Sequence, residues 1–238
     1  MTDRSTVDGG CHSSYNFFNI SENSPVVEEE TSKMNFWNDE SGDWEDLATA
    51  ARDVPRYREI AHLIDWFCPN GSVLDIGCGS AVLRDYLPEG VKYLGVEPSA
   101  KAIQWSRAKY GCDSIVHSTG EAFDPGKRQW DCIIFNEMLY YTLDPLGLLG
   151  KYAKLIKLEG IIIISIYQKT ENFSIKTRLM YWMDRRRPMS NVHCTKMVHD
   201  FMVRDGWLIE RDEAIAIPGS GEHWRIFVVK SPAPSSAR

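Results

Sequence analysis

Apolar and polar positions alternate with two different periods along the middle of the chain. Short apolar runs near 72–76, 92–97, 114–117, 130–135 and 160–167 are typical of buried strands. The segments between them near 79–87, 99–110 and 144–157 have helical patterns, and Ser99 is a suitable N-cap for the second. Strands and helices in alternation predict a parallel sheet covered by helices on both faces.

The two ends of this region follow a different pattern. Helical periodicity runs from about Arg52 to Phe67, with Pro69 just beyond it. After the last parallel strand we expect a helix over 195–204 and strands over 207–217 and 224–230. The sequence PGSG between those strands predicts a hairpin, so that one of them runs antiparallel to the rest.

Length and composition predict one domain with extensions. The 238 residues are 43% hydrophobic, enough for a substantial core, and no run of 18 apolar residues predicts a membrane span. The formal charge of −6 argues against a nucleic-acid partner, because phosphate binding needs a basic face. Six cysteines without CxxC spacing, and a start without the apolar region of a secretory signal, predict a reduced cytoplasmic protein.

These patterns divide the chain into a core and its extensions. The predicted parts are a flexible acidic and polar N-terminal arm (1–33), a lid and helix (34–68), a core (69–231) that contains a substrate-side insertion (169–192), and a disordered tail (232–238).

A strand, a glycine turn and a helix start come together in residues 72–81, which read SVLDIGCGSA. Gly77 and Gly79 let the backbone turn sharply and approach a ligand closely. Glu97 ends the next apolar run about 20 residues beyond Gly77, where a carboxylate binds ribose hydroxyls in nucleotide sites. Val82 stands where a dinucleotide motif needs its third glycine, so we expect a ribonucleoside without a pyrophosphate.

VLDIGCGSA, with VEPS behind it, resembles motifs I and II of the class I S-adenosylmethionine-dependent methyltransferases. The resemblance implies an α/β fold: a Rossmann-like, doubly wound, seven-stranded, mostly parallel sheet with an antiparallel C-terminal hairpin strand. It also implies S-adenosyl-L-methionine as cofactor, bound by Asp75, Gly77, Gly79 and Glu97. The family usually has glycine where this chain has Ala81.

Two further stretches resemble motifs of that family. Residues 118–122 (STGEA) resemble the stretch whose acid binds the adenine amino group, which assigns that role to Glu121; the alternative is an exposed loop carboxylate. Residues 136–141 (NEMLYY) resemble motif IV, which places Asn136 beside the cofactor. Some relatives have a metal-binding histidine where this chain has Tyr140, so no metal site is expected.

Methyl transfer from a sulfonium depends mainly on in-line positioning of the acceptor. A base is needed only where the acceptor loses a proton. The candidate catalytic residues are Glu137, Tyr140 and His223, with His193 and His199 as weaker candidates. The alternatives are that Tyr140 packs at a helix start and that each histidine is an ordinary surface residue.

The predicted function is methyl transfer to an N or O atom, in preference to C, of a small-molecule acceptor. The aromatic residues of 36–57 and of the insertion suit a flat or lipid-like acceptor, and Arg185-Arg186-Arg187 suit an anionic one. The insertion is alternatively a solvated basic loop. Two other functions stay open: a catalytically inactive methyltransferase-like binding protein and an NAD(P)-dependent oxidoreductase. The oligomeric state is also open.

Overall fold

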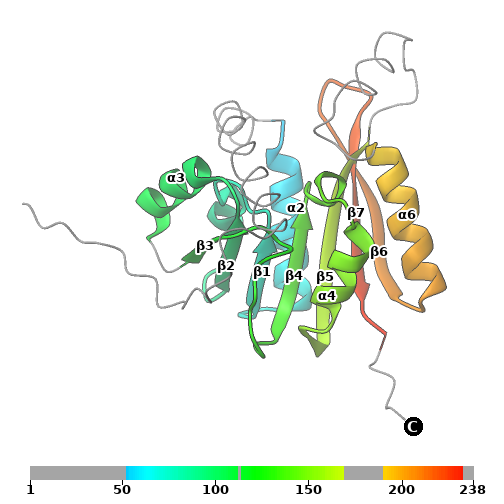
Figure 1. Ribbon diagram of the computed structural model, residues 1–238. Coiled ribbons are helices and arrows are strands. Elements are labelled where there is room, and N and C mark those ends of the chain that lie inside the picture. Colours follow the sequence, from blue (N-terminus) through cyan, green and yellow to red (C-terminus); the bar gives the residue numbers. More distant parts are fainter. Residues whose placement is uncertain (1–51, 112–113, 169–189, 233–238) are drawn as a thin grey trace, which may run out of the picture.

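The computed structural model describes residues 52–111, 114–168 and 190–232, which form a seven-stranded sheet with the strand order β3-β2-β1-β4-β5-β7-β6 (Figure 1). The strands are β1 (Ser72–Ile76), β2 (Lys92–Glu97), β3 (Ile115–His117), β4 (Trp130–Asn136), β5 (Ile156–Gln168), β6 (Leu208–Ala216) and β7 (His223–Lys230). The first five pair in parallel, and β7 is antiparallel to both β5 and β6. The predicted fold class is therefore confirmed.

Helices join these strands largely where the sequence predicts them. They are α2 (Val54–Phe67), α3 (Ala100–Tyr110), α4 (Pro145–Ala153) and α6 (Asn191–Arg204), with short 3₁₀ helices η1 (Val82–Tyr86) and η3 (Leu139–Tyr141). Ser99 caps α3, as predicted, by accepting a hydrogen bond from the Ala102 N–H at 3.2 Å.

Three predicted helix boundaries are wrong. The helix expected over 79–87 is only the 3₁₀ helix η1, because the glycine turn extends through Ala81 in a left-handed conformation. The helix expected over 144–157 ends at residue 153, because Ile156 already pairs with Trp130 as part of the sheet. The helix expected from residue 195 begins at residue 191, where the Ser190 side chain caps it, so it takes up the end of the predicted insertion.

The core lies on both faces of the sheet. Side chains alternate between the faces along each strand, so Val73, Ile134 and Ile163 pack with α2 while their neighbours pack with α4 and α6. In Figure 1, α4 and α6 lie in front of the sheet and α2 lies behind it. Full burial of one such isoleucine or valine stabilises the fold by about 1.5–3 kcal/mol relative to exposure.

The same alternation places polar side chains together at the carboxyl ends of the parallel strands. Asp75 follows Val73 by two positions on β1, and Ser165 follows Ile163 by two on β5, so both share the α2 face. Glu97 likewise shares the face of Tyr93 on β2. All three lie toward the carboxyl ends of parallel strands, where ligands bind in open α/β sheets.

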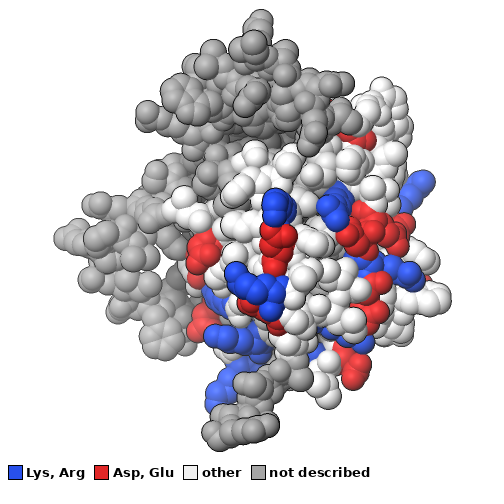
Figure 2. Space-filling model, turned by 90° about the vertical axis from the view of Figure 1, so that its right-hand side faces the viewer, with Lys and Arg blue, Asp and Glu red and all other residues white. Residues whose placement is uncertain are grey.

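Several predicted features lie outside the described residues: the arm over 1–33, the lid aromatics Phe36, Trp37 and Trp44, the three arginines from Arg185 to Arg187, and the end of the tail. In the part of the chain that the structure describes, no helix combines the length and apolar character needed to span a bilayer. Figure 2 shows acidic and basic side chains interspersed on one side of the molecule. On the β6–β7 hairpin, Arg225 pairs with Asp212 at 2.7 Å.

Candidate functional site

The glycine turn after β1 has three residues in the left-handed backbone region: Gly77 (φ 71°), Gly79 (φ 55°) and Ala81 (φ 57°). A Cβ on Gly77 would lie 2.9 Å from the Cβ of Met138, whereas a Cβ on Gly79 would meet no described atom within 4 Å. Gly77 therefore allows close packing, and Gly79 faces space that is open among the described residues. Ala81 adopts a conformation that glycine tolerates better, which is a physical reason for the glycine that the family usually has there; the alanine itself has no structural explanation.

Glu97 fixes this turn to the end of β2. Its carboxylate accepts the Gly79 N–H at Oε2 and the Ser99 N–H at Oε1, both at 2.8 Å. Burial raises the pKa of Glu97 to about 7, although the two N–H donors act to lower it. The predicted ribose acceptor thus lies directly beside the open face of the glycine turn.

Asp75 lies beneath the turn and is 1% exposed. Its Oδ2 accepts the Tyr93 hydroxyl at 2.8 Å, while Oδ1 is buried without a hydrogen-bond partner among the described residues. Burial raises the pKa of Asp75 to about 7. An unfilled buried acceptor close to an open glycine turn fits a ligand that carries ammonium or hydroxyl donors.

The loop after β3 carries Glu121 and adjoins Glu97. The Ser118 N–H donates to the Glu97 carbonyl oxygen at 3.1 Å, which continues the strand-end contacts into this loop. Glu121 itself is exposed. Both residues that the sequence assigns to the nucleoside therefore belong to adjoining segments at the same end of the sheet.

The turn after β4 holds Glu137 in a left-handed conformation with φ 62°, which is strained for a side chain of this size. The Tyr140 hydroxyl donates to Glu137 Oε2 at 3.0 Å, and the Glu137 N–H donates to the Ser165 carbonyl oxygen at 3.0 Å. Burial raises the pKa of the Glu137 carboxyl, and the nearby Arg56 opposes that shift. The structure thus brings two of the three predicted catalytic residues together.

Arg56 of α2 is a site residue that the sequence analysis missed. Its Nη1 lies 3.5 Å from Glu137 Oε2, and its guanidinium lies 4.9 Å from the ring centroids of both Tyr57 and Trp224. Burial by itself would lower the pKa of Arg56, but the charges around it, Glu137 foremost, raise it. The sequence feature that could have identified Arg56 is its helical spacing. Arg56 lies four residues before Ile60 and eight before Ile64, on the face of α2 that is buried.

Ser165 is the second residue that the sequence analysis missed. Its Oγ lies 2.8 Å from Asn136 Oδ1 and 3.2 Å from Glu137 Oε1, so its single proton serves one acceptor at a time. The Ser165 hydroxyl therefore lies between the side-chain oxygens of Asn136 and Glu137. A serine inside an isoleucine-rich strand was the signal available in the sequence.

His223 does not join this cluster. It pairs with Gln168, whose side chain donates to Thr195 Oγ1 of α6 at 2.6 Å, and alternation along β7 puts its neighbour Trp224 on the α2 face. His223 thus belongs to the α6 face of the sheet, and none of the described hydrogen bonds or ion pairs joins it to Glu137. Its catalytic role stays a prediction.

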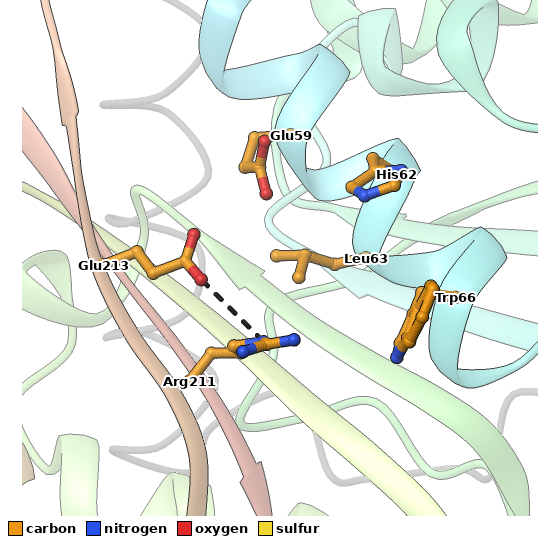
Figure 3. Close-up of a pocket in the computed structure, with 6 residues that line it drawn as sticks. All are labelled: Glu59, His62, Leu63, Trp66, Arg211 and Glu213. Atoms are coloured by element: carbon orange, nitrogen blue, oxygen red, sulfur yellow. Dashed lines mark ion pairs between the residues drawn. The ribbon is translucent and has the colours of Figure 1, made fainter.

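A separate surface pocket of about 140 Å³ lies between α2 and β6 (Figure 3). Its lining residues are Glu59, His62, Leu63, Trp66, Arg211 and Glu213. Arg211 and Glu213 lie on the β6 wall of the pocket and form an ion pair, with Arg211 Nε 3.8 Å from Glu213 Oε1. None of the six belongs to the glycine turn or to the Glu137 turn, so this pocket is distinct from the candidate site.

Comparison with known families gives one match that covers most of the chain. A family model described as a methyltransferase domain matches residues 45–202. Similar curated proteins are the ubiquinone biosynthesis O-methyltransferases of Erwinia tasmaniensis, 27% identical over 149 residues, and of Vibrio cholerae, 25% identical over 155 residues. The matches cover 58% and 63% of this chain and 59% and 62% of those proteins, so the chain spans about three fifths of these relatives.

Solved structures share the fold at low sequence identity. Magnesium protoporphyrin IX methyltransferase from Synechocystis with bound S-adenosylhomocysteine has a TM-score of 0.63 and 15% identity, over 85% of this chain and 100% of that one. The 1,6-didemethyltoxoflavin-N1-methyltransferase of Burkholderia thailandensis has a TM-score of 0.62 and 14% identity, over 90% and 94% of the two chains.

Proposed function

Because the chain belongs to the methyltransferase domain family, we propose that it transfers a methyl group from S-adenosylmethionine to a hydroxyl or amino group of a small molecule. The observation that carries this proposal is the contact between Glu97 and Gly79, which puts a buried carboxylate beside an open glycine turn. A carboxylate in that position suits the two hydroxyl donors of a ribose.

Four residues would hold the cofactor. Glu97 would bind the ribose, and Gly79 would admit the nucleoside where a side chain would obstruct it. The unfilled Oδ1 of Asp75 and the buried guanidinium of Arg56 offer one acceptor and one cation on the same face of the sheet. That pair matches an amino acid moiety, which carries both an ammonium and a carboxylate group.

The bound cofactor supplies an activated methyl group and a neutral leaving group. What the protein adds is orientation of the acceptor and, for a hydroxyl or ammonium acceptor, removal of one proton. Glu137 is the proposed base, because its burial raises the pKa toward the range in which a carboxylate accepts protons well. Tyr140 would fix the orientation of that carboxylate through its hydroxyl.

A hydroxyl acceptor is the more specific form of this proposal. The curated relatives are O-methyltransferases, and an acceptor that loses a proton gives the half-buried Glu137 a role.

Calorimetric titration of the purified protein with S-adenosylhomocysteine tests the cofactor assignment, and absence of binding would contradict the proposed function. Methyl transfer is then measured with labelled S-adenosylmethionine against a panel of small phenols, hydroxy acids and amines. Binding without turnover of any acceptor would favour the inactive binding protein instead.

Substitution of the proposed base separates its role from cofactor binding. Glu137→Gln keeps the shape of the side chain and is expected to lower kcat about 10²–10⁴-fold, with a small change in the affinity for S-adenosylhomocysteine. Tyr140→Phe removes the hydroxyl that donates to Glu137 Oε2 and leaves the Ser165 hydroxyl within hydrogen-bond distance of Oε1, so it should lower kcat less than Glu137→Gln.

A further inference from the structure

One lysine of α4 forms hydrogen bonds with the backbone of the loop that follows β3. Lys151 Nζ donates to the carbonyl oxygens of Gly120 at 3.2 Å, Glu121 at 2.7 Å and Phe123 at 2.7 Å. An ammonium has three N–H donors and no acceptor, so these three carbonyls can use its full donor capacity. The Lys151 ammonium thus binds three backbone carbonyl oxygens of this loop at once.

The neighbouring residue strengthens the same contact. The Tyr152 hydroxyl donates to the Gly120 carbonyl oxygen at 2.8 Å, so two consecutive residues of α4 bind this part of the loop. Tyr152 is fully buried and packs edge-on against Phe135 of β4. The loop is therefore fixed to the same core layer that supports the turn after β4.

Close packing fixes the loop from its other side. A Cβ on Gly120 would lie 2.8 Å from Ile76 Cγ2, so the loop lies directly on the end of β1. Phe123 is buried in the core between the sheet and α4. Both flanks of Glu121 are therefore held, by the packing of Gly120 and Phe123 and by the carbonyl contacts of Lys151.

We propose that Lys151 is a positioning residue that fixes the 118–123 loop so that Glu121 can bind the adenine amino group of the cofactor. This inference rests on the proposed function, since it assumes that S-adenosylmethionine binds at the glycine turn. Lys151 acts through the backbone of the loop, and Ser118 links that loop to the carbonyl of Glu97. The three charge-assisted hydrogen bonds make the loop stiff before the nucleoside arrives.

The test compares Lys151→Met with Lys151→Arg and with Lys154→Met. We expect Lys151→Met to raise the Kd of S-adenosylhomocysteine and the KM of S-adenosylmethionine about tenfold, with kcat at saturating cofactor within about twofold of wild type. Lys151→Arg keeps the charge and several donors, so it should restore most of the affinity. Lys154→Met removes the same charge from an exposed lysine at the end of α4 and should leave the Kd unchanged.

A ligand analogue distinguishes positioning from general loosening of the fold. The 6-deamino analogue of S-adenosylhomocysteine lacks the group that Glu121 is proposed to bind. If Lys151 positions Glu121, then Lys151→Met weakens S-adenosylhomocysteine much more than this analogue. Equal weakening of both ligands would overturn the positioning of Glu121, and so would an unchanged Kd in folded Lys151→Met.

Two controls keep the outcome interpretable. If Lys151→Met does not fold, Tyr152→Phe removes a second donor to the Gly120 carbonyl while it keeps the buried ring, and the same preference for the intact adenine is measured there. Absence of S-adenosylhomocysteine binding to the wild-type protein would overturn the proposed function itself. Binding to wild type with no discrimination in the variants would overturn only the role of Lys151.

Discussion

The carboxylate of Glu97 accepts a hydrogen bond from the backbone N–H of Gly79 at 2.8 Å, across eighteen residues of sequence. The parallel pairing of β1 with β2, in register from Ser72 with Lys92 to Ile76 with Val96, brings these residues together at one end of the sheet. Two separate parts of the sequence motif therefore form one structural unit.

Removal of that carboxylate should weaken the cofactor. We expect Glu97→Ala to reduce the affinity for S-adenosylhomocysteine by about 1–3 kcal/mol, because buried ribose hydroxyls and the Gly79 N–H lose their acceptor. Calorimetry measures the change, with Glu89→Ala as the control, since Glu89 is an exposed carboxylate in the loop before β2. An affinity equal to that of wild type would refute the ribose assignment.

Gly79→Ala tests whether the space above the turn belongs to the ligand. Gly126→Ala is its matched control, because both glycines have left-handed φ angles (55° and 64°) and neither has a described atom within 4 Å of an added Cβ. Each substitution should destabilise the protein by about 1–2 kcal/mol in urea denaturation through backbone strain. Only Gly79→Ala should also abolish or strongly weaken S-adenosylhomocysteine binding; equal affinities in the two variants would contradict the site.

The ion pair between Arg56 and Glu137 should show strong energetic coupling. Arg56→Met leaves the half-buried Glu137 carboxylate, whose side chain is 18% exposed, without its cation, so the loss should be below the about 3–5 kcal/mol that removing one partner of a fully buried pair costs. Glu137→Gln in the same chain removes the stranded charge and should recover part of that loss. Urea denaturation of both single variants and the double variant measures the coupling, and strictly additive effects would mean that the pair does not interact.

The buried carboxyl of Asp75 predicts how stability depends on pH. Its pKa is raised by burial to about 7 in the folded protein, so the folded state retains a proton that the unfolded chain releases near pH 4. The stability contributed by protonated Asp75 is therefore fully present below about pH 4 and is lost as the pH rises toward 7.

Asp75→Asn removes this titration. In the ligand-free protein, the free energy of unfolding of wild type should fall relative to that of Asp75→Asn between about pH 4 and pH 7, by about 1.4 kcal/mol for each unit of pKa shift. Urea denaturation across that range gives the difference at each pH. A difference that is constant with pH would show that Asp75 titrates normally.

The parallel sheet and the cofactor turn could be predicted from local patterns. Short apolar runs predict strands because a buried strand needs apolar side chains on both faces, and Ser99 predicts a helix start because its hydroxyl can accept a free N–H of the first turn. Gly77 and Gly79 predict a sharp turn because few other residues adopt positive φ without strain. Helix lengths were predicted less well, since the pairing of Ile156 with Trp130 ends α4 early.

The sequence by itself determined the strands, the glycine turn after β1 and the acidic residue Glu97 at the end of β2. Each of these depends on conformational preferences within a few residues or on a known spacing along the chain. Only the tertiary structure decided that Arg56 meets Glu137, that Lys151 binds the Glu121 loop, and that His223 lies on the other face. Those relationships depend on strand order and on which face each side chain takes. A distance in space between residues that are far apart in sequence is set by packing, and no local pattern records it.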